Sequence, residues 1–320
     1  IDTTYNSSVG FSAVTLIASG SITDAESASV SPVNNVTAAS LLMTAGSTTT
    51  STTGIGSASN AIETQVATLA LRSGTAGAFV LESNALSIDA VSSTINRVNA
   101  QGTAATQSDS GEDANSGGIL VVQAGGTLTI NGGTASAASG INATGNVLLK
   151  TTSGNIALAA GLTSAGNVSL DASGNVTQSA DGDITLTGSA KTLDVLATGS
   201  ITMTDGAVSQ TNNADVRYSA GSSLALSQIN AGTANVAVVA GSGAITDAEN
   251  GSAVNNVIAG KVLEAFHAPF SMDGHEFHGG ASLGIGDPRM VVANDYPPHA
   301  ITRGFQVNVL FPQAVALATV

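Results

Sequence analysis

The sequence predicts an all-β protein that winds as a parallel β-solenoid, with roughly 20 residues in each turn. Short phrases of the form Gly-Asn-(Val/Ile)-x-Leu recur, and their apolar residues alternate as in a strand with one buried face. Gly, Asn, Asp and Ser separate the phrases, as turn residues do in all-β folds. Because the phrases resemble one another, each is expected to stack on its predecessor, which favours a solenoid over a sandwich.

The phrases set the expected length of one turn. The strictest are GNVLL at Gly145, GNIAL at Gly154, GNVSL at Gly166, GNVTQ at Gly174 and GDITL at Gly182. The intervals from Val147 to Val168 and from Ile156 to Val176 each fit one turn. With turns stacked at about 4.8 Å, residues 1–262 predict a shaft of about 13 turns and about 60 Å.

Two segments within the shaft depart from the pattern. Residues 101–117 contain almost no large apolar side chain, so they predict a loop or an inserted arm that leaves the rod. Asn60–Leu71 predicts a short helix or an irregular turn, because its apolar residues fit one helical face. Those residues are Ile62, Val66, Leu69 and Ala70. Elsewhere the density of Gly and β-branched residues disfavours helix.

Composition and charge exclude several function classes. The chain has 320 residues, of which 9% are charged and 3% aromatic, with a net charge of −14 and no Cys. An acidic chain without a Lys/Arg patch is unsuited to nucleic acid or to anionic lipid. The absence of Cys removes disulfides, thiolate metal sites and thiol nucleophiles. No apolar run is long enough to span a membrane, and the first residue, Ile1, suggests a processed product or an excised segment.

One long phrase is written twice. GSITDAESASVSPVNNV begins at Gly20, and GAITDAENGSAVNNV begins at Gly243. Together with GIGSASNAIETQVATLAL from Gly54 and ESNALSIDAV from Glu82, the phrases resemble the repeat region of filamentous-haemagglutinin-type exoproteins, which use two-partner secretion. The resemblance covers about residues 10–260. The repetition also predicts tandem duplication of a multi-turn block in a longer parent protein.

The resemblance implies a right-handed parallel β-helix that serves as a secreted rod on the bacterial cell surface, in adhesion or biofilm cohesion. It also implies an outer-membrane secretion partner. The segment is expected to be internal shaft, because the family's secretion domain and its Asn-Pro-Asn signature are not visible in the sequence. The expected partners are glycans or proteins on host or neighbouring cells, or further copies of the chain, without insertion into a membrane.

The most regular carboxylates are those of the two TDAE phrases: Asp24 and Glu26, and Asp247 and Glu249. Residues i and i+2 share one strand face, so each pair could bind Ca²⁺ or act as acid and base. Calcium takes about six to eight oxygen ligands, and the clustered acids or bases of a lyase or hydrolase are missing. We therefore expect these residues to face water at a strand end, and we predict no catalytic, cofactor-binding or metal-binding residue.

Residues 263–320 form an irregular tail of a different composition. All four His residues lie there, at His267, His275, His278 and His299. The phrase SMDGHEFHGG could gather Asp273, His275, Glu276 and His278 around Zn or Ni, although ordinary loop residues are the simpler interpretation. The tail is expected to be a cap, a docking element, a non-native reading frame or a fused segment.

These observations predict a structural and adhesive shaft that is not an enzyme. Two alternatives remain open at this point. The chain could be a subunit of a self-assembling extracellular filament, or a β-helix enzyme that acts on polysaccharides.

Overall fold

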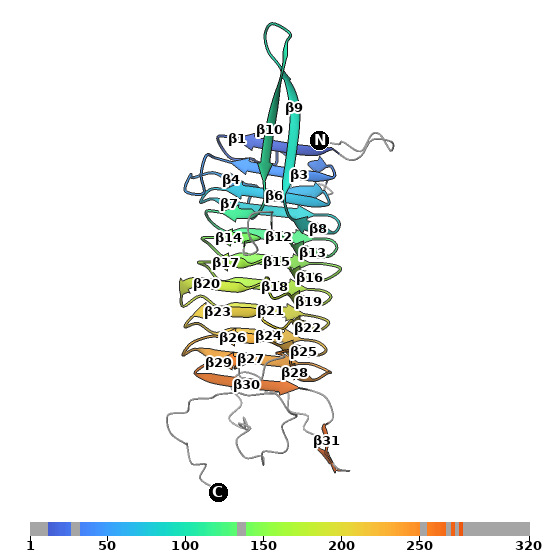
Figure 1. Ribbon diagram of the computed structural model, residues 1–320, viewed down its shortest axis with the longest axis vertical. Helices are drawn as coiled ribbons and strands as arrows, with labels where there is room; N and C mark the ends of the chain where they lie inside the picture. Colours follow the sequence, from blue (N-terminus) through green and yellow to red (C-terminus); the bar gives the residue numbers. More distant parts are fainter. Residues whose placement is uncertain are drawn as a thin grey trace.

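The computed structural model describes residues 12–26, 33–132, 139–249, 255–266, 270–272 and 275–277. Within these ranges the regular structure is all β-strand, and the chain winds into a β-solenoid of about nine turns. Figure 1 shows the turns stacked into one rod, with β1 near one end and β30 at the other. The predicted fold class is therefore confirmed. No described segment forms a helix that could cross a membrane.

From β7 onward each turn has one long and two short sides. The long side is a stack of parallel strands: β7 (Gly77–Glu82), β12 (Leu120–Ala124), β15 (Val147–Thr151), β18 (Val168–Ala172), β21 (Leu193–Ala197), β24 (Val216–Ala220), β27 (Asn235–Ala240) and β30 (Lys261–Phe266).

The two short sides alternate along the chain after each long strand. The first consists of β8 (Leu86–Ile88), β13 (Leu128–Ile130), β16 (Ile156–Leu158), β19 (Val176–Gln178), β22 (Ile201–Met203), β25 (Leu224–Leu226) and β28 (Ile245–Asp247). The second consists of β11 (Ala114–Ser116), β14 (Ile141–Ala143), β17 (Leu162–Ser164), β20 (Ile184–Ser189), β23 (Val208–Asn212), β26 (Gln228–Asn230) and β29 (Val257–Ile258).

At the N-terminal end the long and short sides exchange places. The six-residue strands β1 (Ala13–Ala18), β3 (Ser40–Ala45) and β6 (Thr68–Ser73) stack on one another and lead into the short-side strands β8 and β11. The sheet that holds β7 is divided there into β2 (Val36–Thr37), β4 (Gly54–Ile55) and β5 (Ile62–Gln65). The long strands of the first turns therefore lie in one sheet of the rod, and those of the later turns lie in the other sheet.

The register of the strands agrees with the predicted turn length in the middle of the rod. Val147 pairs with Val168, and Ile156 pairs with Val176, as the sequence spacing predicts. Other turns are longer, because Val236 pairs with Val262 at the C-terminal end. The prediction of about 13 turns was therefore wrong: loops and one long insertion lengthen individual turns, and about nine turns result.

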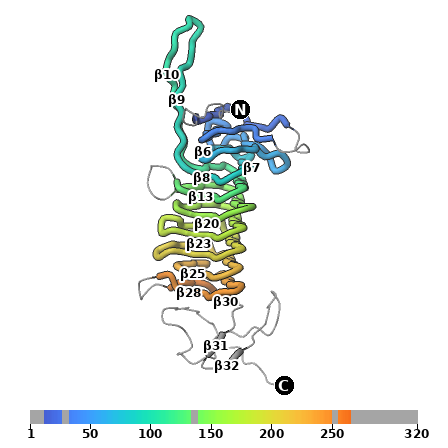
Figure 2. Tube along the Cα trace, turned by 90° about the vertical axis from the view of Figure 1, so that its right-hand side faces the viewer, coloured from blue at the N-terminus to red at the C-terminus, as the bar shows by residue number. Residues whose placement is uncertain are grey.

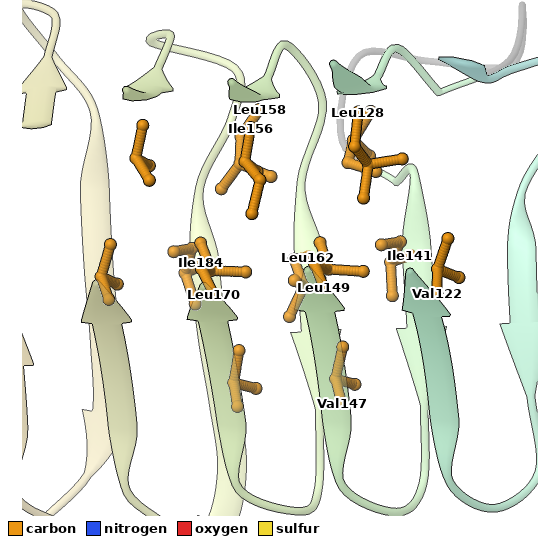
Figure 3. Packing of buried hydrophobic residues seen from close by; sticks show 14 of the residues in the cluster. Val122, Leu128, Ile141, Val147, Leu149, Ile156, Leu158, Leu162, Leu170 and Ile184 are labelled. Atoms are coloured by element: carbon orange, nitrogen blue, oxygen red, sulfur yellow. The ribbon is translucent and has the colours of Figure 1, made fainter. Parts of the chain in front are cut away.

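The core is a continuous column of small and medium apolar side chains inside the three sides. In β15 the inward residues are Val147 and Leu149, and the short sides add Ile156, Leu158 and Leu162, all buried. Figure 3 shows these side chains pointing into the space that the turns enclose. Because each turn covers the apolar face of the next, burial and backbone pairing stabilise the rod together.

The Gly-Asn phrases lie at the corners of the turns, where they serve two purposes. A Cβ on Gly166 would lie 2.3 Å from the carbonyl carbon of Gly145 in the preceding turn, so only glycine fits that close approach. Beside it, the backbone N–H of Asn167 donates to Asn146 Oδ1 at 2.9 Å. At a second corner the N–H of Asn175 donates to Asn155 Oδ1 at 2.8 Å. The recurring phrase therefore encodes stacked corners as well as strands.

The arm predicted at residues 101–117 is present, but it begins earlier. Strands β9 (Val91–Val98) and β10 (Ala104–Gly111) pair as an antiparallel hairpin inserted between β8 and β11. Figures 1 and 2 show the hairpin running along the rod and beyond β1. Its turn is held by Asn99 Oδ1, which accepts hydrogen bonds from the N–H groups of Gln101 and Thr103.

Asn60–Leu71 forms neither a helix nor an irregular turn. It contains β5 and most of β6, with a corner at Val66 between them. Ile62, Val66 and Leu69 all point into the core. A corner restarts the alternation of inward residues, and this produces a spacing that resembles a helical face.

Most of the tail lies outside the described residues. β30 continues the long side of the solenoid to Phe266 by pairing with β27. Beyond it, β31 (Phe270–Met272) and β32 (His275–Phe277) form a short antiparallel pair. The division of the chain into a shaft at 1–262 and a tail at 263–320 stays a prediction.

Candidate functional sites

Both copies of the repeated phrase fold into the same hydrogen-bonded unit, which we call the TDAE module. In the first copy, Asp24 Oδ1 accepts from the N–H of Glu26 at 2.9 Å and from Asn35 Nδ2 at 2.7 Å. In the second, Asp247 Oδ1 accepts from the N–H of Glu249 at 2.8 Å and from Asn256 Nδ2 at 2.7 Å. The same Asp–Asn hydrogen bond therefore joins TDAE to VNNV in both copies, although the two residues are 11 apart in the first copy and 9 apart in the second.

Each module also joins two stacked long strands. β1 precedes the first copy and pairs in parallel with β3, which follows it. β27 precedes the second copy and pairs in the same way with β30. One complete turn of the rod is thus repeated, although its long strand lies in one sheet at the N-terminus and in the other sheet at the C-terminus. This supports the duplication of a block inferred from the sequence.

The geometry of the module assigns its aspartates a structural role. Asp24 follows an isolated bridge between Ile22 and Ile55 and lies outside any strand, so Asp24 and Glu26 do not share a strand face as expected. The hydrogen bond from the N–H of Glu26, with a further one from the Asn35 amide, lowers the pKa of Asp24. In the described part of the chain no group of three His, Cys, Asp or Glu residues could hold a metal ion.

The candidate metal ligands of the tail are only partly described. His275 and Glu276 belong to β32. Asp273 and His278 lie outside the described residues, as do His267 and His299. The proposed Zn or Ni site therefore stays a prediction.

Two buried polar groups inside the rod were not singled out from the sequence. Glu82 is 1% exposed, and its carboxylate accepts from Thr64 Oγ1 at 2.7 Å and from the N–H of Val66 at 3.0 Å. Tyr218, also 1% exposed, contacts Ser209 and Gln178 in the core. Each lies in an otherwise ordinary alternating strand, so no local sequence signal marks it.

The hairpin arm offers a continuous exposed surface that is rich in hydrogen-bonding side chains. Its base is fixed to the rod, since Val91 packs with Leu42 and Ala70, and Ser93 Oγ lies 2.5 Å from Thr15 Oγ1. Beyond this base, every residue from Thr94 to Ser108 is exposed. The apolar exceptions among mostly Thr, Ser, Asn and Gln include Ile95, 55% exposed, and Val98, 64% exposed.

Comparison of the chain with protein-family models, with curated proteins and with solved structures finds no match. The resemblance to filamentous-haemagglutinin-type exoproteins therefore stays a prediction from the quoted phrases.

Proposed function

We propose that this chain is a structural and adhesive shaft of a secreted bacterial surface protein, with the β9–β10 arm as its contact element. The observation that carries the proposal is the pairing of a stacked rod with an exposed hairpin that projects past its end. A rod of parallel turns keeps its contact element away from the surface that bears it. The exposed hydroxyls and amides of the arm suit weak hydrogen bonding to glycans or proteins, repeated over many copies.

The arrangement of charges is consistent with this role. The net charge of −14 disfavours nonspecific aggregation. On the outer face of the long side, Lys150 pairs with Asp171 and Arg217 with Asp194, each across adjacent turns. These pairs are partly exposed and contribute little to stability, but they neutralise two cations that could otherwise attract anionic ligands.

The proposal is tested by shortening the arm. In the variant, residues 94–108 are replaced by Asn-Gly, a two-residue turn that joins Ser93 to Asp109 in their paired register. Beads coated with wild-type protein or with the variant are applied to bacterial biofilms and to host-cell layers, and retained beads are counted. We expect retention of the variant to fall by about tenfold or more, as loss of a multivalent contact predicts. Equal retention of both, or no retention of the wild type, would contradict the proposal.

A filament subunit is a second candidate, since the TDAE modules close turns near both ends of the rod. Electron microscopy of purified protein distinguishes the two: isolated rods support the shaft, and long end-to-end fibres support the filament.

A further inference from the structure

The first TDAE module is completed by the turn that follows it. The segment Gly54–Gln65 lies along the module and makes hydrogen bonds at both of its ends. At one end the N–H of Ile22 donates to Gly54 O at 2.9 Å, and at the other the N–H of Glu63 donates to Asn35 Oδ1 at 2.8 Å. Between them, Asn60 Nδ2 donates to the carbonyls of Asp24 and Glu26 at 3.3 and 3.0 Å.

The second module has no such completion among the described strands. Within the described ranges β28 pairs with β25 and β29 pairs with β26, and neither strand has a described partner on its C-terminal side. Asn256 corresponds to Asn35 and is fully buried, yet its Oδ1 has no hydrogen-bond partner. Its Nδ2 is fully used, because it donates to Asp247 Oδ1 and to the carbonyls of Leu226 and Ser227.

A buried carbonyl oxygen without a partner is costly, and native proteins rarely leave one unpaired. In the first module, the same atom of Asn35 is satisfied by a backbone N–H of the next turn. By this comparison, a backbone N–H of a following turn is the kind of donor that Asn256 Oδ1 lacks.

We propose that the C-terminal edge of the second module, formed by β28, Asn256 and β29, is a docking site for one further extended segment with the chemistry of Gly54–Gln65. The partner is a stretch of this same repeat type that adds to the rod as a new pair of short strands. Binding is by strand addition, with main-chain hydrogen bonds for affinity and one Asn side chain for recognition.

The long side limits the site to these two short strands. β30 carries Glu264 at the position where β3 carries the fully buried Met43, as the matched modules show. Met43 pairs with Leu71 of the next long strand. A carboxylate in that inward column opposes burial under another apolar strand, so the docked segment does not include a counterpart of β6.

The test adds the chain's own completing segment in trans. A fluorescent peptide GIGSASNAIETQ, which is Gly54–Gln65, is titrated into the full-length chain, and its anisotropy is followed. We expect saturable binding, and about tenfold weaker binding of the Asn60→Ala peptide, since it loses two hydrogen bonds. The full-length Asn256→Ala variant should also bind more weakly. The matched Asn35→Ala variant should bind as the wild type does, because its site is already filled.

A cross-link locates the peptide independently of any effect of Asn256→Ala on folding. Thr37 pairs with Gln65 in the first module, and Ile258 is the residue that corresponds to Thr37 in the second. The chain has no Cys, so each introduced thiol is unique. A Gln65→Cys peptide should form a disulfide with the Ile258→Cys chain and not with the Thr37→Cys chain. Absence of binding, or equal cross-linking to both, would overturn the docking site.

This inference does not rest on the adhesive role. Rods that adhere through the arm and do not bind the peptide would refute the docking site alone. Rods that bind the peptide and lose no adhesion when the arm is shortened would refute only the proposed function.

Discussion

The hydroxyl oxygen of Tyr218 lies 2.6 Å from Ser209 Oγ at the centre of the rod. Both are buried, and Gln178 Oε1 lies within hydrogen-bonding distance of each, at 3.3 and 3.2 Å. Gln178 Nε2 in turn donates to the carbonyl of Val208 at 2.9 Å. The three side chains come from the two short sides and the long side of successive turns, so the network fixes how those turns align.

Replacing Tyr218 by Phe should therefore lower the free energy of unfolding by about 1–2 kcal/mol, because Ser209 and Gln178 lose a buried partner. Urea unfolding followed by circular dichroism measures the change. Thr202→Ala serves as the control, since Thr202 is exposed on β22 and its loss should be nearly neutral. A Tyr218→Phe variant as stable as the wild type would show that the network contributes nothing.

The same burial raises the pKa of Tyr218. An ordinary tyrosine ionises near pH 10, so Tyr218 should remain a phenol at about pH 11 while the rod is folded. Phenolate absorbance of the folded wild type and of Tyr218→Phe should then be equal at that pH. A larger absorbance in the wild type would mean that Tyr218 ionises, and that water reaches this part of the core.

Glu82 should make the rod less stable as pH rises. Desolvation raises the pKa of Glu82 above its ordinary value of 4.5, and the hydrogen bonds from Thr64 and Val66 only partly oppose it. The folded chain therefore holds this proton at pH values where the unfolded chain has released it. Between those two pKa values the free energy of unfolding falls with increasing pH.

The measurement is the difference in unfolding free energy between wild type and Glu82→Gln at a series of pH values from about 4 upward. The Gln side chain cannot ionise, so the difference isolates Glu82 from other groups such as Asp24. The wild type should lose stability relative to the variant as pH rises above 4.5. A difference that stays constant, or changes in the opposite direction, would contradict the prediction.

The parts of the fold that the sequence predicts are those set by short-range pattern. Val147 and Val168 are register partners because both follow Gly-Asn corners and both alternate inward, and this pattern is local. At Ile62 and Val66 the pattern misleads, because a corner between two strands places inward residues four apart. The number of turns was overestimated because a loop's length does not show whether it belongs to a turn or leaves the rod.

The TDAE module could be recognised in sequence only by its repetition. The bond from Asn256 to Asp247 spans nine residues and the one from Asn35 to Asp24 spans eleven, so no fixed spacing encodes it. The sequence shows that VNNV recurs after TDAE, but only the structure shows that an Asp–Asn hydrogen bond joins the two phrases. That Asn256 Oδ1 is buried without a hydrogen-bond partner depends on its three-dimensional surroundings, which the local sequence pattern does not encode.

The hydrogen bonds between stacked Asn corners predict that mutation of Asn167 lowers the free energy of unfolding. Its N–H donates to Asn146 Oδ1, and its own Oδ1 accepts from the N–H of Thr192 at 2.9 Å. Asn167→Ala leaves the N–H of Thr192 without its side-chain acceptor. The free energy of unfolding should fall by about 1 kcal/mol and not more, because the site is exposed and water can replace part of the hydrogen bond. Urea unfolding measures it, and the same substitution at Asn96, on the exposed arm, should cost less than half as much.

Removal of the projecting part of the arm, residues 94–108, should leave the rod folded and equally stable. Its contacts with the rod are confined to its base, where Val91 packs on Leu42 and Ala70 and Ser93 meets Thr15. The variant with residues 94–108 replaced by Asn-Gly keeps all of these contacts, so its free energy of unfolding should stay within about 0.5 kcal/mol of the wild type. Urea unfolding and far-ultraviolet circular dichroism measure this. A clear loss of stability would mean that the projecting part contacts the rod after all, and a fall in adhesion could then no longer be attributed to lost surface contacts.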